Sequence, residues 1–287
     1  MSGAEFNPLK HPVCLEFPLW LDETAWAEHV PFAMYLISAL RPRTFVELGT
    51  FRGVSYCAFC QAVVSLSSNT KCFAVDTWEG DEQAGRLEEG VLGKLRAHHD
   101  PLYSDFSSLL EKTFDEALVD FADGTVDLLH IDGFHTYDAV KHDFDTWLPK
   151  MSTRGIIIFH DIAVRKDGFG VWQFWEELCR RFQNFSFSHG NGLGVLLVGT
   201  EMPPEIEKLF EADEGQREII RRFFHQLGER IEAVNVFHHQ NDYIRHFQMH
   251  ENVVMNSAVM RAYRILRTEG IGSLLRKAFK RKDPTGR

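Results

Sequence analysis

Cysteine is scarce in this chain, and long apolar runs are absent from it. The five cysteines among 287 residues are scattered and odd in number, which excludes the class of small disulfide-rich secreted proteins. Cys57 and Cys60 form a C-x-x-C motif, but it lies in a helical pattern and no second pair follows to complete a zinc site. We expect both thiols on a buried helix face, in a reduced, cytoplasmic protein.

We also expect no membrane span, no leader peptide and no basic surface suited to nucleic acid. No apolar run approaches the roughly 18 residues that a span needs, and the N-terminus has no basic segment followed by an apolar one. The formal net charge of −10 argues against nonspecific nucleic-acid binding. Positive charge gathers only in residues 261–287, which predicts a solvated helix end or a weak contact with an anionic membrane surface.

The most informative pattern lies in residues 126–161. Two short apolar runs, Val126–Ile131 and residues 155–159, predict buried parallel strands, and the helical spacing between them completes a βαβ unit. Acidic and imidazole side chains follow the two runs: Asp132, His135, His160 and Asp161. Because parallel strands end at the same edge of a sheet, where open α/β sheets bind ligands, we expect a metal site or an acid/base site there.

The order of the other elements predicts an α/β fold with a mixed sheet and helices on both faces. We expect further strands at residues 44–48 and 71–75 and within 106–111, with helices at 54–64, 114–121 and 168–182, and an antiparallel hairpin at 185–198. Residues 77–104 are polar, and we expect an irregular insertion above the ligand-binding edge.

Three regions are predicted along the chain. Residues 1–30 are expected to form a helical cap, residues 31–200 the main domain, and residues 201–287 a helical extension that begins at a Pro-Pro pair. The extension is expected to contain helices at 205–212, 214–234 and about 242–266, whose apolar faces pack against the core or a partner subunit. We expect a homo-oligomer on this basis.

A glycine loop follows the strand at 44–48 and opens the next helix. Gly49 and Gly53 permit a tight turn with a close approach of the backbone to a ligand. The pattern is G-x-x-x-G, without the central glycine that dinucleotide sites use for pyrophosphate, so a cofactor without phosphates fits better. Asp76, at the end of the strand after it, stands where an acid meets ribose hydroxyls in such sheets.

The segments VELGTFRGVS, AVDTWEGD, LHIDGFHTYDAVKHD and GIIIFHD resemble the S-adenosylmethionine-dependent, metal-dependent sugar O-methyltransferases of the macrocin and mycinamicin type. The resemblance covers about residues 30–200, with the motifs in order. It implies a Rossmann-like methyltransferase fold with a seven-stranded sheet and S-adenosylmethionine (SAM) as methyl donor. The cofactor contacts that it implies are Glu47, Gly49, Gly53, Ser55 and Asp76.

The resemblance also implies roles for the side chains at the two strand ends. Asp132 and Asp161 match acidic metal ligands, and His135 matches the general base, a role that its ordinary pKa of about 6.5 suits. His160 stands where the sugar enzymes have a third acid. Magnesium, which prefers oxygen ligands, is the first expectation, and an imidazole ligand would shift the preference toward manganese, iron or zinc. His160 either binds the metal or turns away from it.

The acceptor is expected to be a hydroxyl of a carbohydrate or of a glycosylated small molecule. Trp78 and Tyr137 flank the predicted edge, and an aromatic ring beside acids is a plausible sugar platform, although Trp78 could equally anchor the loop. Two other functions remain open. One is a non-haem iron oxygenase that uses a two-His, one-carboxylate set, which would leave the glycine loop and Asp76 without a purpose. The other is a non-catalytic glycan-binding protein.

Overall fold

A seven-stranded mixed sheet forms the centre of the protein, as the sequence predicts. The computed structural model describes residues 6–81, 85–86 and 90–255. In sheet order, the strands are β5 (Ser107–Glu111), β2 (Lys71–Asp76), β1 (Thr44–Leu48), β6 (Val126–Ile131), β7 (Met151–His160), β9 (Leu193–Leu197) and β8 (Gln183–Phe187). The first five run parallel, whereas β9 and β8 form an antiparallel hairpin at one edge. The Rossmann-like α/β class and the terminal hairpin are therefore confirmed.

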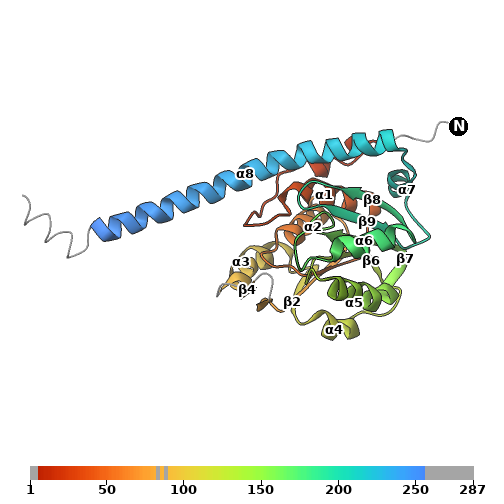
Figure 1. Cartoon of the computed structure of the whole chain (residues 1–287), viewed down its shortest axis with the longest axis horizontal. Coiled ribbons are helices and arrows are strands. Elements are labelled where there is room, and N and C mark those ends of the chain that lie inside the picture. The colour runs from red at the N-terminus through yellow and green to blue at the C-terminus, as the bar shows by residue number, and fades with distance from the viewer. Residues whose placement is uncertain (1–5, 82–84, 87–89, 256–287) are drawn as a thin grey trace, which may run out of the picture. The chain divides into compact units, whose positions relative to one another are not determined.

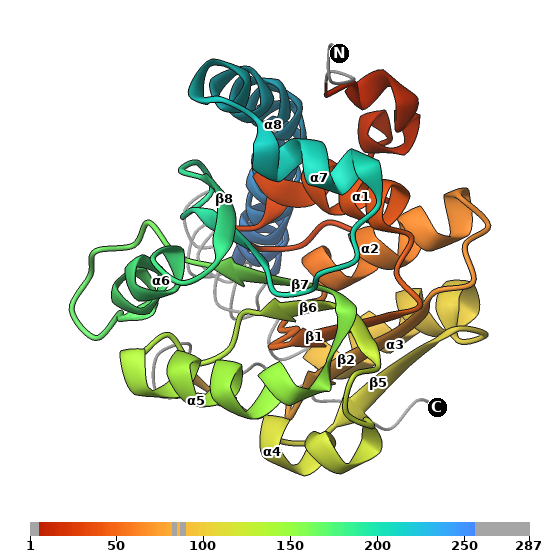
Figure 2. The same ribbon diagram turned by 90° about the vertical axis from the view of Figure 1, so that its right-hand side faces the viewer.

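Helices cover both faces of this sheet (Figure 1, Figure 2). The helices of one face are α1 (Val30–Leu40), α2 (Val54–Ser65) and α3 (Val91–Tyr103), and those of the other are α4 (Phe114–Ala117), α5 (Tyr137–Trp147) and α6 (Val171–Cys179). Strand side chains alternate between the two apolar layers, since Leu128 faces the first layer and Leu129 the second. The cysteines of α2 are buried on its core side, as predicted.

The strand register brings the two polar clusters to one edge of the sheet. Leu48 pairs with Ile131, and Ile131 pairs with Phe159, so the residues that follow β1, β6 and β7 emerge side by side. The Asp132 amide donates to the Leu48 carbonyl at 2.8 Å, which extends the ladder to the point where the chains diverge. This alignment places the glycine loop next to Asp132 and His160.

Residues 77–104 contain a helix, so the expectation of an irregular insertion is wrong. Helix α3 follows a small two-stranded ribbon of β3 (Gly80–Asp81) and β4 (Gly85–Arg86). Its buried residues are spaced four apart, at Val91, Leu95, His99 and Tyr103, which makes one continuous helical face. Two of the four positions carry polar groups and Pro101 lies inside the helix, and these features obscure the helical pattern in the sequence.

Among the described residues, the N-terminal cap contains three short 3-10 helices. These are Pro8–Lys10, Pro12–Leu15 and η3 (Ala27–His29). Proline begins the first two, and since proline fixes φ and lacks an amide donor, it favours such short turns at helix starts. The cap lies over the glycine loop, because Trp20 Nε1 donates to the Arg52 carbonyl at 2.8 Å.

The extension contains α7 (Pro204–Glu211) and α8 (Glu214–Met255). The predicted break after residue 234 is absent, because residues 235–241 contain neither glycine nor proline and α8 continues through them. Ile206, Leu209 and Phe224 are buried with α1 in the first apolar layer, so these faces pack within the chain. The chain divides into compact units at Asn235 and Val236. The basic residues 261–287 and the predicted helix end at 266 lie outside the described residues.

Among the described residues, no helix combines the length and the apolar character that crossing a membrane requires.

Candidate active site

A cavity of about 440 Å³ opens at the carboxyl edge of the parallel strands. Its walls are formed by the cap, the glycine loop and the ends of β2, β5, β6 and β7. Of the residues predicted from the sequence, those that line it are Gly49, Gly53, Ser55, Asp76, Asp132, His135, His160 and Asp161. Both groups of predicted residues, those for the cofactor and those for the metal, therefore face one space of a size typical for ligand pockets.

The glycine loop is held in a conformation that only glycine adopts without strain. Gly49 has φ +86°, and a Cβ there would lie 2.1 Å from the Asp132 carbonyl oxygen. The Asp76 carboxylate fixes the rest of the loop, because Oδ2 accepts from the amides of Thr50 and Phe51 at 2.8 and 2.9 Å. Asp76 therefore shapes the loop directly while its side chain lines the cavity.

Four side chains from the ends of β6 and β7 converge at the cavity. His135 Nε2 lies 2.8 Å from Asp161 Oδ2 and 3.8 Å from Asp132 Oδ1. His160 Nδ1 lies 3.3 Å from Asp132 Oδ1 and 3.5 Å from Asp161 Oδ2. One potential ligand atom from each of Asp132, His135 and Asp161 lies within 4.8 Å of the others. The expectation that the ends of β6 and β7 meet is thus confirmed at the level of side chains.

The orientation of His160 directs a ring nitrogen at both carboxylates. Its Nε2 is 2.9 Å from the Gly190 carbonyl oxygen, to which it must donate. In the neutral ring, Nδ1 then carries a lone pair that faces Asp132 and Asp161, and this arrangement is repulsive unless a proton or a cation lies between them. Within the described part of the chain, no hydrogen bond reaches the buried Asp161 Oδ1. The donor set therefore fits a divalent cation.

The charges of this cluster depend strongly on one another. Burial by itself would lower the pKa of His160, but the Asp132 and Asp161 carboxylates outweigh it and raise that pKa to about 10. Burial likewise opposes the rise of the His135 pKa to about 9, which the same two carboxylates cause. The histidines in turn hold the pKa of Asp161 near 2 and that of Asp132 well below its usual range, against the effect of burial. Without a cation, the cluster retains protons at neutral pH.

Asp161 has an unusual backbone conformation. Its φ is +61°, the left-handed region that Asp and Asn enter more readily than other non-glycine residues. Asp161 directly follows the last residue of β7. At this turn its carboxylate lies 2.8 Å from His135 Nε2. Strained backbone of this kind concentrates at functional sites.

Three of the predicted site residues lie outside the cavity lining. The Glu47 carboxylate is wholly buried and contacts His130, consistent with His130 being an interior histidine. Trp78 Nε1 donates to the Phe51 carbonyl at 3.0 Å, which anchors the loop. The Tyr137 hydroxyl contacts the Glu177 carboxylate at 3.1 Å. The structure therefore gives Trp78 and Tyr137 no direct place in this cavity.

Several lining residues were not predicted. Thr113 and Phe114 follow β5, and residues 23–26 belong to the cap. The position directly after a parallel strand would have indicated Thr113 and Phe114, but that strand is short and hard to place in the sequence. No pattern in the cap sequence indicates that residues 23–26 turn toward the site.

Comparison with known proteins agrees with this architecture. Residues 46–162 match the family model described as a methyltransferase domain. An uncharacterized protein of Sinorhizobium fredii, y4gI, is 51% identical over 191 residues, which are 66% of this chain and 21% of that protein. The chain thus spans about a fifth of the length of this curated relative.

Solved structures with a similar chain path include two O-methyltransferases. One is TomG of Streptomyces achromogenes, which is involved in tomaymycin synthesis and was solved with SAM; it is 15% identical, with a TM-score of 0.46 over 69% of this chain and 99% of that one. The other, from Bacillus cereus with S-adenosylhomocysteine (SAH), is 13% identical, with a TM-score of 0.45 over 63% of this chain and 84% of that one. The strand order, rather than these scores, establishes the fold.

Proposed function

We propose that this chain is a SAM-dependent O-methyltransferase in which a divalent cation, bound by Asp132, His160 and Asp161, assists the reaction at an acceptor hydroxyl. One observation carries the proposal: the glycine loop with Asp76 and the cluster of carboxylates and imidazoles line a single cavity. The match of residues 46–162 to a methyltransferase family model supports the reaction class.

The cofactor wall suits a nucleoside without a pyrophosphate. Bound SAM would supply a methyl group on a positively charged sulfur. The close approach of Gly49 to Asp132 leaves bare backbone facing the cavity, while Asp76 offers a carboxylate to ribose hydroxyls. Phe114 adds an aromatic ring against which a purine can pack. We therefore assign Gly49, Gly53, Ser55, Asp76, Thr113 and Phe114 to cofactor binding.

The cation wall offers two carboxylates and the Nδ1 atom of His160. A bound cation would lower the pKa of a hydroxyl that coordinates it, as it does for water. This mixed set accepts magnesium with waters completing the octahedron, and its imidazole favours manganese or iron by comparison with an all-oxygen site. The Gly190 carbonyl keeps His160 in the orientation that such ligation needs.

His135 is assigned the role of general base. Its ring stacks on Phe169 with a centroid distance of 4.8 Å and an interplanar angle of 11°, which fixes the imidazole plane beside Asp161. The two carboxylates that raise its pKa are the proposed cation ligands. Positive charge on them would lower the His135 pKa toward neutrality, where an imidazole takes protons from hydroxyls efficiently.

The acceptor is proposed to be a hydroxyl of a carbohydrate or a glycosylated metabolite. The cap contributes Glu23 and Thr24 to the cavity, and their oxygens can hydrogen-bond to sugar hydroxyls. The polar cap edge and the resemblance to sugar O-methyltransferases support this class. The homo-oligomer and the cytoplasmic location expected from the sequence stay predictions.

Ligand-dependent thermal stability tests the proposal without a known acceptor. The purified chain is heated with SAH, with NAD and with 2-oxoglutarate, each with and without EDTA. SAH should raise the melting temperature, and manganese or magnesium should raise it further unless EDTA is present. A screen of glycan and glycoside acceptors with methyl-labelled SAM then identifies the product.

The site variant Asp161→Asn and the matched surface variant Asp167→Asn test cation binding separately from cofactor binding. Asp161→Asn should keep the stabilisation by SAH and lose the stabilisation by the cation, while Asp167→Asn should behave like the unaltered chain because residue 167 is exposed. Stabilisation by 2-oxoglutarate with iron, or by none of the compounds, would contradict the methyltransferase assignment.

A further inference from the structure

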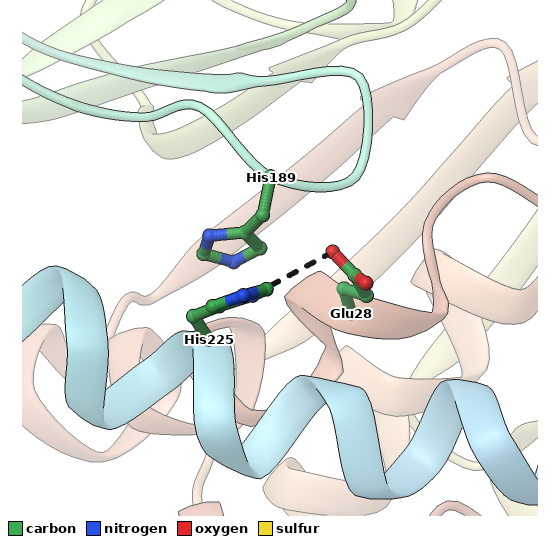
Figure 3. A group of neighbouring side chains, drawn as sticks. All are labelled: Glu28, His189 and His225. Atoms are coloured by element: carbon green, nitrogen blue, oxygen red, sulfur yellow. Dashed lines mark ion pairs between the residues drawn. The ribbon is translucent and has the colours of Figure 1, made fainter.

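A second cluster of metal-binding residue types lies close to the active site. Glu28 comes from η3, His189 from the turn between β8 and β9, and His225 from α8. One potential ligand atom from each lies within 4.8 Å of the other two. Figure 3 shows the His189 ring over the His225 ring and the Glu28 carboxylate beside His225, each from a separate segment. All three belong to the compact unit that ends at Asn235, and none is among the residues that line the cavity.

The contact between Glu28 and His225 is too long for a hydrogen bond. Glu28 Oε2 lies 3.9 Å from His225 Nδ1, whereas N–H···O hydrogen bonds span about 2.7–3.2 Å. This Nδ1 atom is shielded from solvent, and no hydrogen bond from the described residues reaches it. Two ligand atoms that share a tetrahedral zinc at about 2.1 Å each lie about 3.4 Å apart. The separation therefore suits a shared cation better than a direct contact.

Further acidic side chains lie around the cluster. Glu229 and Glu232 both act electrostatically on the Glu28 carboxyl, so negative charge surrounds the three potential ligands and would attract a cation.

The surrounding backbone holds the three segments close together. A Cβ on Gly228, one turn after His225, would lie 2.1 Å from the Glu28 carbonyl oxygen, so glycine is what lets α8 approach η3. The rings of His189 and His225 lie 4.7 Å apart. His225 Nε2 lies 3.7 Å from Glu229 Oε1, so a further carboxylate stands near the other nitrogen of this ring.

We propose that Glu28, His189 and His225 form a second divalent-cation site, for zinc or a similar borderline transition metal. Two imidazoles and one carboxylate are ligands typical of zinc, with a fourth position for water. The bound cation would join η3, the β8–β9 turn and α8. It would also fix Gly190, whose carbonyl accepts from both His29 Nε2 and His160 Nε2 at 2.9 Å. The site goes beyond the proposed methyl transfer and does not depend on it.

Zinc stoichiometry of the full chain tests this site. The purified protein is stripped with EDTA, dialysed, titrated with zinc chloride and analysed by calorimetry and elemental analysis. His225→Gln should bind one equivalent fewer than the unaltered chain, with that site weakened by more than about 100-fold. His142→Gln is the matched control, because His142 is a solvent-exposed histidine with a single carboxylate contact, to Asp115.

Two further comparisons keep this test separate from the active site and from misfolding. The double variant Asp132→Asn/Asp161→Asn should retain the equivalent that His225→Gln removes, whether or not the active site binds a cation. In EDTA, His225→Gln should melt like the unaltered chain, and only the rise that zinc produces should shrink. If His225→Gln does not fold, Glu28→Gln supplies the same comparison. Equal zinc stoichiometry in the unaltered chain and in the cluster variant would overturn the proposal.

Discussion

Glu47 and His130 form a wholly buried pair across adjacent strands of the sheet, with Glu47 Oε2 2.8 Å from His130 Nδ1. The two residues are register partners of β1 and β6, and burial raises the pKa of the Glu47 carboxyl, against the lowering effect of His130. The acid that sequence resemblance assigns to the cofactor is thus wholly buried, paired with His130 and outside the cavity lining.

Removing one member of this pair should destabilise the fold. Glu47→Ala should lower the free energy of unfolding by about 3 kcal/mol, because it leaves His130 buried without its partner. Glu47→Gln should cost about 1 kcal/mol, because the amide can still bond to the ring. Urea unfolding gives the stabilities, and SAH affinity is measured in the same samples. A large loss of SAH affinity in Glu47→Gln with unchanged stability would instead make Glu47 a cofactor contact.

Gly49→Ala should abolish cofactor binding or prevent folding. The new Cβ would stand 2.1 Å from a backbone carbonyl that cannot move without separating β1 from β6. Gly124→Ala is the control, because Gly124 also has positive φ, at +72°, but has open space around the Cβ position. The control should lose only about 1 kcal/mol from backbone strain. SAH titration and urea unfolding of both variants measure the difference. Similar losses of SAH affinity and stability in the two variants would show that the close approach of Gly49 to the Asp132 carbonyl is not the cause.

Asp161→Asn should lower turnover by at least about 100-fold, because it removes a charged ligand while an Asn still tolerates the left-handed backbone. SAH affinity should stay close to that of the unaltered chain, while the free energy of unfolding should fall by about 1–2 kcal/mol because His135 and His160 lose a charged partner. Removal of the cation with EDTA should reproduce the loss, and manganese should restore the unaltered chain but not the variant. Full turnover in EDTA would show that the cation is dispensable.

Asp143 should make stability depend on pH. Burial raises the pKa of this α5 carboxyl to about 7, Asp115 adds to the rise and His142 opposes it. Between about pH 4 and pH 7 the folded chain keeps a proton that the unfolded chain has released, so this contribution is fully present at low pH and is lost as pH rises through 7. From pH 5 to pH 8 the loss is on the order of 3 kcal/mol.

Asp143→Asn should remove that dependence and stabilise the chain at pH 8. Asp145→Asn, an exposed change on the same helix, should leave it intact. Urea unfolding at pH 5 and pH 8 compares the three proteins. Parallel pH profiles for the unaltered chain and Asp143→Asn would mean that Asp143 titrates normally.

The sequence predicts those features that a local pattern determines. Val126–Ile131 is apolar at four of its six positions and β6 is buried throughout, so its end, and therefore Asp132, could be placed. The same reasoning placed His160 and Asp161. The orientation of His160 could not be predicted, because it depends on the Gly190 carbonyl, thirty residues further along the chain.

Long-range packing likewise decided where prediction and structure differ. Trp78 is directed by its bond to the Phe51 carbonyl, a partner that no spacing rule identifies. The cap residues Glu23 and Thr24 reach the cavity because Trp20 fastens the cap to Arg52. The cluster of Glu28, His189 and His225 joins positions almost two hundred residues apart, and it exists only once η3, the hairpin turn and α8 have docked.

The left-handed backbone at Asp161 limits which amino acids this position can hold. Glutamate has the same charge but gains nothing from the local side-chain bonds that let Asp and Asn adopt this conformation, and β-branched residues are excluded by their own bulk. Asp161→Glu, a substitution that is harmless at most surface positions, should therefore destabilise the backbone here. Saturation mutagenesis at position 161 should return almost only Asp among the active clones. Asn and Gly should appear among the clones that fold but have no activity.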